Sequence, residues 1–409
     1  MYGTMFVFAT DLVDEGLETV LDNLQRRGGL SGVSLAVAYH HARDVFPHNP
    51  RRKVIYLEGG TTFFRPNPAE YTDTPLQPVA SRLAEERDVL AELVAACERR
   101  GMVVHAWTVY LHNSRLGHLH PDLCQENAFG DRYLSNLCPA NPAVRAFARA
   151  LSRDLARRGA RCILSESLSY HGLAHGDHHE RYFLKFDARV HFLMSLCFCA
   201  FCLRAAREAG VDGERLRGWV RAELERFFAD QAAETDLAEL SRAEAAAMAG
   251  GEMAGLLRAR EQVVTSLTAE VAQEIARGSD TRLQAFDMSG AARGYATGRP
   301  QGGPVLEYAW HDGVDVPALA QVAPGIEAIA YAHAPERVRF DVEAYRRVLP
   351  ADKPLSLAMR PMLPDVDRPE NLAAKVRLAR ELGIAWIDFY HYGFARLQAL
   401  DWIRQAMEG

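Results

Sequence analysis

Eight short apolar runs alternate with helix-forming segments along the chain, and this alternation limits the fold more than any other feature. The runs span residues 5–10, 33–39, 103–107, 162–165, 283–286, 328–331, 355–359 and 386–389. Runs of this length suit buried strands, and the segments 82–99 and 142–158 carry apolar residues at helical spacing. Eight strand–helix pairs predict a single (β/α)8 barrel domain over residues 1–409, an α/β fold of the TIM-barrel class. An open doubly wound sheet is the alternative, but no G-x-G-x-x-G follows the first run.

Two long stretches exceed what a minimal barrel needs. Residues 42–80, after the second strand, contain many turn residues and a strand-like piece at 53–57, so we expect an excursion over the barrel top. Residues 200–278, after the fourth strand, are rich in Ala, Glu and Arg and predict two or three long helices packed on the barrel side. Their apolar stripes suit an intramolecular helix pair, with a homo-oligomer contact as the alternative. The Gly-rich segment 290–303 predicts a long loop at the barrel mouth.

Composition and charge exclude several classes of partner. The net charge of −6 argues against nucleic acid, and no stretch approaches the ~20 apolar residues that cross a bilayer. The start, MYGTMFVFATDLVDEG, lacks the basic region of a signal peptide. We therefore expect a cytoplasmic protein, in which thiols stay reduced and clustered cysteines favour metal over disulfides.

The run LCFCAFC places three thiols, Cys197, Cys199 and Cys202, in a C-x-C-x-x-C spacing. Zinc prefers thiolate ligands in tetrahedral sites, so this run predicts a zinc site that needs one more ligand. The candidates for the fourth position are Cys138, Cys124, His175, His178 and His179. A four-cysteine site would be closed and structural. The alternative is three buried cysteines at the start of an apolar helix.

Polar and aromatic residues stand where the predicted strands end, which is where barrel enzymes place their active sites. We take as candidates Asp11, His40, His41, Trp107, Glu166, Asp287, Tyr331, Arg360, Asp388, Tyr390 and His391, with Tyr170 and His171 lining the pocket after Glu166. Glycoside cleavage needs two carboxyl groups, and Glu166 is the first. Asp287 and Asp388 are the candidates for the second, with Asp287 favoured because its strand adjoins the fourth.

Structural roles compete with several of these assignments. Asp11 is also suited to cap a helix, and Asp388 to lie in the barrel core, paired with Arg360. Because side chains alternate along a strand, at most one of His40 and His41 faces the site.

The order of motifs in residues 136–203 resembles glycoside hydrolase family 42, β-galactosidases that carry a cysteine-bound zinc. The pieces are LCPANPAVRAFARALSRDLARRGARCILSESLSYHG, followed by LCFCAFC. The resemblance implies that Cys138, Cys197, Cys199 and Cys202 bind zinc and that Glu166 is the catalytic acid/base. The same pieces also look like uncharacterised α-amylase-like or α-fucosidase-like barrels, which carry an Asp nucleophile at the position of Glu166.

The chain departs from the family 42 pattern at two strands. Ser165 precedes Glu166 where the family has Asn, and the seventh strand, LSLAMRPM, carries Arg360 where the family has its nucleophilic Glu. A guanidinium at that position suits an anionic sugar, because it binds carboxylate with two hydrogen bonds. Alternatively, Arg360 neutralises Asp388 or Glu166.

Together these features predict a glycoside hydrolase-like enzyme that acts on a small carbohydrate, with Glu166 as acid/base or nucleophile, and Arg360 suggests that this carbohydrate is an anionic sugar. The first alternative is a lyase or isomerase on the same barrel, in which Glu166 and His171 or His391 transfer protons. The second is a sugar-binding barrel without catalysis.

Overall fold

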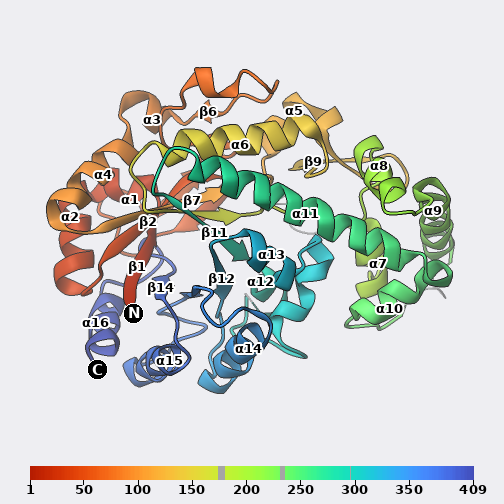
Figure 1. Ribbon diagram of the computed structural model, residues 1–409. Helices are drawn as coiled ribbons and strands as arrows, with labels where there is room; N and C mark the ends of the chain where they lie inside the picture. The colour runs from red at the N-terminus through yellow and green to blue at the C-terminus, as the bar shows by residue number, and fades with distance from the viewer. Residues whose placement is uncertain (174–179, 231–234, 295) are drawn as a thin grey trace.

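Eight parallel strands close into a barrel at the centre of the computed structural model, which describes residues 1–173, 180–230, 235–294 and 296–409 (Figure 1). The barrel strands are β1 (Tyr2–Val7), β2 (Gly32–Tyr39), β7 (Val103–Val109), β10 (Cys162–Glu166), β11 (Arg282–Asp287), β12 (Gly325–Ile329), β13 (Leu355–Met359) and β14 (Trp386–Phe389). Each pairs in parallel with the next along the chain, and β1 pairs with both β2 and β14, which closes the ring. The predicted (β/α)8 barrel is therefore confirmed.

All eight predicted strands are present, with shifted bounds at two of them. The first ends at Val7, and helix α1 (Ala9–Glu15) begins where the strand was expected to continue. Asp11 ends the strand early because its carboxylate accepts the Phe8 amide at 2.8 Å and caps the helix. The sixth strand starts at Gly325, three residues before the expected start. The prediction missed these residues because Glu327 interrupts the apolar run, although its side chain is completely buried inside the barrel.

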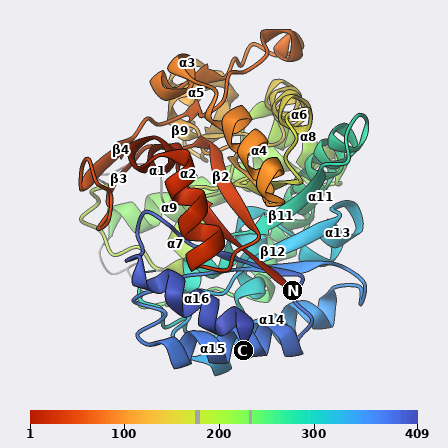
Figure 2. The ribbon, with the colours of Figure 1, turned by 90° about the vertical axis from the view of Figure 1, so that its left-hand side faces the viewer.

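Helices surround the barrel and cover its strands (Figures 1 and 2). They are α2 (Leu17–Asp22), α3 (Arg82–Glu86), α4 (Val89–Arg100), α5 (Ser114–Leu119), α6 (Pro142–Ala156), α13 (Val316–Val322), α14 (Pro335–Val348), α15 (Pro369–Glu381) and α16 (Gln398–Glu408). A short π-helix at Asn23–Arg27 continues α2. The predicted helix 142–158 is confirmed, with the Asn141 side chain accepting from the Ala143 amide at 2.9 Å. The predicted helix 82–99 divides in two, because Asp88 caps a new helix at Val89.

Residues 42–80 form a hairpin of β3 (Ala42–Val45) and β4 (Val54–Leu57), followed by the short strands β5 (Thr61–Thr62) and β6 (Val79–Ala80). A 3-10 turn at Pro68–Tyr71 lies between them, and β5 runs antiparallel to the end of β2. The strand-like piece predicted at 53–57 is thus confirmed as one arm of a hairpin. A second hairpin, β8 (Cys124–Glu126) and β9 (Arg132–Leu137), follows β7.

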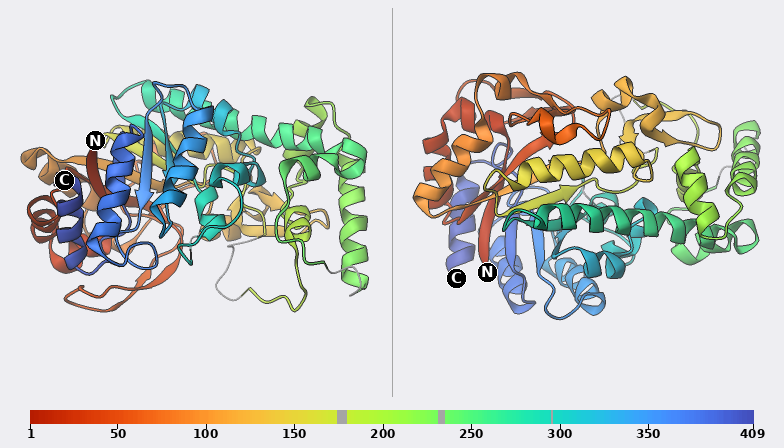
Figure 3. Two further views of the ribbon diagram at one scale, coloured as in Figure 1. Left: turned by 90° about the horizontal axis from the view of Figure 1, so that it is seen from below. Right: turned by 45° about the horizontal axis from the view of Figure 1, so that its top comes forward.

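A helical extension follows β10 and projects to one side of the barrel (Figure 3). It contains α7 (Ala188–Met194), α8 (Ala200–Glu208), α9 (Gly213–Ala229), α10 (Arg242–Ala247), a 3-10 turn (Met248–Gly251) and the long α11 (Met253–Ala276). Leu216, Val220, Leu224 and Leu256 belong to a core of its own, which Trp310 joins from the barrel side. The expected long helices are present as α9 and α11, and α11 runs from the extension back across the barrel (Figure 1).

The segment predicted as a long loop at 290–303 begins as a helix, α12 (Ser289–Gly294), and a 3-10 helix follows at Val305–Asp312. In the described part of the chain, no helix combines the length and apolar character needed to cross a lipid bilayer.

A polar cluster lies inside the barrel, around the completely buried Asp388. Its carboxylate accepts hydrogen bonds from the hydroxyls of Thr4 and Ser34, and from Trp386 Nε1 at 2.7 Å. Burial opposes ionisation of Asp388, but His105 and the two hydroxyls hold its pKa below the usual value, while burial and Asp388 itself raise the pKa of Glu327. This core position was one of the two alternatives for Asp388, although its expected partner, Arg360, lies elsewhere.

We expect Asp388→Ala to lower the free energy of unfolding by about 3–5 kcal/mol, because three buried donors lose their acceptor. The control is Asp401→Ala, which removes an exposed carboxylate paired with Arg27 and is expected to cost less than about 1 kcal/mol. Urea denaturation of both variants gives the comparison. Equal stability of the two variants would contradict the structural role of Asp388.

Candidate active site and metal centre

A cavity of about 390 Å³ lies at the carboxyl ends of the barrel strands. This size falls within the range of small-molecule sites. Its lining comes from six barrel strands or the loops that follow them: Tyr39, His40, Trp107, His112, Glu166, Ser167, His171, Phe286, Met288, Ala291, Asp312, Ile329, Tyr331 and Tyr390. The cavity therefore contains six of the predicted site residues, namely His40, Trp107, Glu166, His171, Tyr331 and Tyr390.

Glu166 ends β10 and reaches the cavity from the fourth barrel strand. It is 7% exposed, and Trp107 Nε1 donates to its Oε2 at 2.5 Å. Burial raises the pKa of Glu166 to about 7, although the indole hydrogen bond favours the ionised form. A carboxyl group with such a pKa can both give and take a proton near neutral pH.

Asp312 is the second carboxyl group of the cavity lining. It was not among the residues predicted from the sequence. It ends the 3-10 helix after β11, in the segment WHDG, and not a strand. Burial raises the pKa of Asp312 to about 7, with a contribution from Asp287, while Arg260 lowers it. A search restricted to strand ends could not find this residue, because the chain returns to the pocket only after α12.

Three histidines line one side of the cavity. The ring of His112 lies 5.0 Å from that of His40 and 5.5 Å from that of His171, measured between ring centroids. His112 was not predicted, because it follows β7 by three residues and no strand pattern marks it. His41, in contrast, is exposed and outside the lining, which agrees with the expectation that at most one of the pair faces the site.

Aromatic rings form the rest of the wall. The Trp107 ring packs edge-on against Tyr39 at 4.7 Å and against Tyr390 at 6.0 Å, and Tyr331 lies 5.9 Å from Tyr390. Such rings offer flat apolar surfaces to a ligand. The guanidinium of Arg360 lies over Tyr331 at 4.5 Å and forms a two-point ion pair with Asp365, at 2.7 and 2.8 Å. The expected pairing of Arg360 with Asp388 is thus replaced by one with Asp365.

Asp287, the favoured second carboxyl group, has structural partners on both oxygens. Its Oδ1 accepts from the amide and hydroxyl of Ser289, and its Oδ2 from the hydroxyl of Tyr345 at 2.5 Å. It therefore holds the turn into α12 against α14, and Asp312 stands in the cavity instead.

Three other predicted residues lie away from the cavity lining. Asp11 caps α1, as its structural alternative proposed. His391 is completely buried, with its Nε2 3.8 Å from Asp11 Oδ2, and burial lowers its pKa well below the usual value. Tyr170, expected to line the pocket, lies behind it, with its hydroxyl 3.3 Å from Cys202 Sγ. His171, which was predicted together with Tyr170, does line the cavity.

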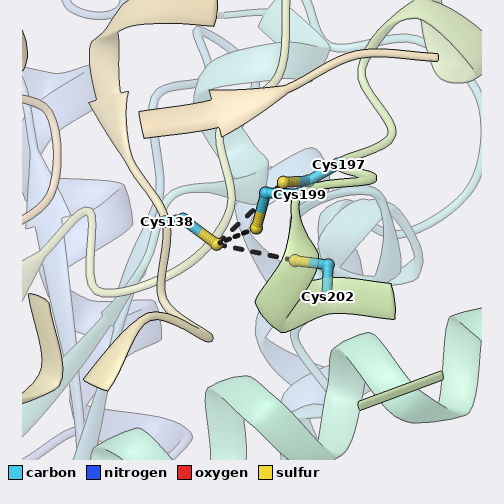
Figure 4. A group of neighbouring side chains, drawn as sticks. All are labelled: Cys138, Cys197, Cys199 and Cys202. Carbon is cyan, nitrogen blue, oxygen red and sulfur yellow. Dashed lines mark hydrogen bonds between the residues drawn. The ribbon is translucent and has the colours of Figure 1, made fainter. Parts of the chain in front are cut away.

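Cys138, Cys197, Cys199 and Cys202 form a buried cluster in which all four sulfurs lie within 4.8 Å of one another (Figure 4). Cys138 comes from the loop between β9 and α6, Cys197 and Cys199 from the turn that connects α7 to α8, and Cys202 from the first turn of α8. Cys138 Sγ lies 3.5 Å from Cys199 Sγ, 3.5 Å from Cys202 Sγ and 4.0 Å from Cys197 Sγ. The cluster could hold a metal ion, and none of its cysteines forms a disulfide.

The geometry of the cluster fits a tetrahedral thiolate site. With Zn–S bonds of about 2.3 Å, the sulfurs of a tetrahedron stand ~3.8 Å apart, close to the distances observed. Cys199 is the N-cap of α8, and the Glu126 amide donates to Cys197 Sγ at 3.3 Å. Cys124 lies outside the cluster, with its Sγ 3.7 Å from the Gly117 carbonyl oxygen. The alternative ligands His175, His178 and His179 fall outside the described residues.

Comparisons with known proteins place this arrangement within one fold. No family model matches the sequence, and no curated protein matches it. Among solved structures, the chain is similar over its whole length to a β-galactosidase from the psychrophilic Marinomonas ef1, with a TM-score of 0.55 and 10% identity, and it spans 59% of that chain. It is also similar over its whole length to an endo-1,4-β-mannanase from Rhizomucor miehei, with a TM-score of 0.52, 9% identity and 94% of that chain covered. At this identity, these similarities establish the (β/α)8 barrel fold.

Proposed function

We propose that this protein is a glycoside hydrolase in which Glu166 is the acid/base and Asp312 is the second carboxyl group. The observation that carries the proposal is the position of Glu166: it ends the fourth barrel strand, faces a cavity of sugar size and has a pKa of about 7. Two solved structures that share the fold are named as a β-galactosidase and a mannanase, which supports the same class.

In the proposed mechanism, protonated Glu166 gives its proton to the glycosidic oxygen as the bond to the leaving group breaks. Ionised Asp312 either activates a water molecule or attacks the anomeric carbon. Trp107 donates to Glu166 Oε2 and so orients the carboxyl group and stabilises its ionised form after proton transfer. The configuration of the released sugar distinguishes the two roles of Asp312: inversion implies water activation, and retention implies a covalent intermediate.

We propose a neutral sugar in preference to an anionic one. The case for an anionic substrate depended on Arg360, and that guanidinium is engaged with the Asp365 carboxylate and the Tyr331 ring. The cavity lining combines two carboxyl groups, three histidines and several aromatic rings, which suits hydroxyl groups and the apolar face of a pyranose.

A second candidate function is a lyase or isomerase that transfers protons between carbons. The observation that favours it is the collection of groups in one cavity: two carboxyl groups, Glu166 and Asp312, whose pKa values are both about 7, together with three histidines, His40, His112 and His171. A sugar-binding protein without turnover is the third reading.

We further propose that the four cysteines bind a structural zinc ion. The donor set and the sulfur distances support zinc, and a closed four-thiolate shell leaves no position for substrate.

Wild-type protein should hydrolyse at least one member of a panel of nitrophenyl glycosides, uronides included. Glu166→Gln and Asp312→Asn should each lower kcat/KM by roughly 10²–10⁴-fold, because each removes a proton-transfer group. The control, Asp401→Asn, changes an exposed carboxylate and should keep wild-type rates. Sugar binding that survives Glu166→Gln, with no turnover of any glycoside, would instead support the binding protein, and turnover of a free sugar the isomerase.

Glu166→Gln should also stabilise the fold at pH 8. Burial raises the folded-state pKa of Glu166 above its unfolded value of about 4.3, so the carboxyl group favours folding below pH ~4.3 and this advantage is lost as the pH rises to about 7. Urea denaturation should therefore show the variant to be roughly 3 kcal/mol more stable than wild type at pH 8, and the difference should shrink by pH 5. If the difference in stability between the variant and wild type is the same at both pH values, burial does not raise the pKa of Glu166.

Metal analysis of protein purified under reducing conditions should find about one zinc ion per chain. Cys138→Ser should lose most of it, because a hydroxyl is a poor zinc ligand. Cys97→Ser is the matched control: Cys97 is equally buried but outside the cluster, so zinc content should be unchanged. Zinc-free wild type after purification with added zinc would exclude the proposed site.

A further inference from the structure

The segment that follows Glu166 contacts the cavity on one side and the cysteine cluster on the other. Glu166, Ser167 and His171 line the cavity, whereas the Tyr170 side chain is completely buried on the opposite side. Its hydroxyl lies 3.3 Å from Cys202 Sγ. The Tyr170 side chain therefore connects the segment that follows Glu166, the proposed acid/base, to the proposed metal centre.

Tyr170 also contacts the second carboxyl residue of the cavity. Its backbone amide donates to the carbonyl oxygen of Asp312 at 3.1 Å. The guanidinium of Arg260 lies over the Tyr170 ring at 4.7 Å, and Arg260 Nη2 donates to the carbonyl oxygen of His311 at 2.8 Å. Two consecutive carbonyl groups are therefore held in place by Tyr170 and by the side chain stacked on it.

The packing around Tyr170 leaves little freedom for movement. Gly313, which follows Asp312, has a φ of +71°, and a Cβ at this position would lie 2.9 Å from Tyr170 Cδ2. Only glycine adopts this backbone conformation and this close approach without strain. The 3-10 helix that ends at Asp312 is therefore packed directly against the tyrosine ring.

We propose that Tyr170 is a positioning residue through which the four-cysteine centre fixes the two cavity carboxyl groups, Glu166 and Asp312. This inference rests on the proposed function for the roles of those groups, and on the contacts above for the link itself. A bound metal ion would hold Cys202 Sγ relative to Cys138, in the loop between β9 and α6. The Tyr170 hydroxyl donates to that thiolate, and its ring and amide carry the constraint to residues 311–313. Zinc thus acts on the cavity without touching a substrate, in the way that outer-shell contacts orient a site.

Amide hydrogen exchange of the zinc-loaded protein tests this link without any substrate. Tyr170→Phe keeps the ring and the stack with Arg260 but removes the hydroxyl, and exchange in residues 167–173 and 310–314 should rise about tenfold, the effect of one lost hydrogen bond. Tyr110→Phe is the matched control. Tyr110 is also completely buried, follows strand β7 beside Glu166, and has its hydroxyl 2.7 Å from Ser152 Oγ, away from the cluster. It should leave residues 310–314 unchanged.

Removal of zinc completes the test as a cycle. Chelation of wild-type protein should raise exchange in the same two segments, and the further increase in Tyr170→Phe should be small, because the link is already broken. If Tyr170→Phe folds poorly, Arg260→Lys is the second variant. It loses the planar stack on Tyr170 but keeps the charge, and it provides an independent measurement of amide exchange in residues 310–314. The proposal is overturned if Tyr170→Phe leaves residues 310–314 at the wild-type rate, or if Tyr110→Phe accelerates them equally.

The result separates this link from the proposed activity. If exchange changes as expected and no glycoside is hydrolysed, the link stands and the glycosidase proposal fails. If a glycoside is hydrolysed, Tyr170→Phe should lower kcat by about tenfold with little change in KM, because positioning of proton-transfer groups acts on the chemical step.

Discussion

Closure of the parallel barrel is the constraint on which the rest of this structure depends. The pairing of β1 with both β2 and β14 brings the carboxyl ends of eight strands to one face, although the strands are spread over almost the whole chain. Trp107 and Glu166 meet because β7 and β10 are adjacent in this ring, with Leu164 in register with Trp107. Closure also creates an interior, where Asp388 collects hydrogen bonds from donors on β1, β2 and β14.

Desolvation then separates the carboxyl groups into different chemical roles. Asp388 is buried among donors that favour its ionised form, and it is a structural acceptor. Glu166 is buried and Asp312 is half-buried, both with fewer compensating contacts, so their pKa values rise to about 7. The same physical effect thus makes one carboxylate part of the core and leaves two others able to exchange protons near neutral pH.

The loops and the helical extension add what the barrel lacks. The 3-10 helix after α12 brings Asp312 to the cavity. The turn between α7 and α8, together with the first turn of α8, brings three cysteines to Cys138 (Figure 4). Tyr170 contacts both groups. A site assembled from such distant segments needs contacts that hold those segments in place. A closed cluster of four thiols is well suited to provide such a contact.

The sequence by itself determined the eight strands, the helices around 82–99 and 142–158 and the three cysteines of the C-x-C-x-x-C run, because these depend on local periodicity and on short motifs. It also placed Glu166 at a strand end, since a strand and its last residue are read from consecutive positions. It did not mark Asp312 as part of the cavity lining or Asp365 as the partner of Arg360, and it placed Tyr170 in the pocket and not behind it. Those outcomes depend on which side chains become neighbours when loops fold back over the barrel, and burial and hydrogen bonding at such contacts are properties of the tertiary structure alone.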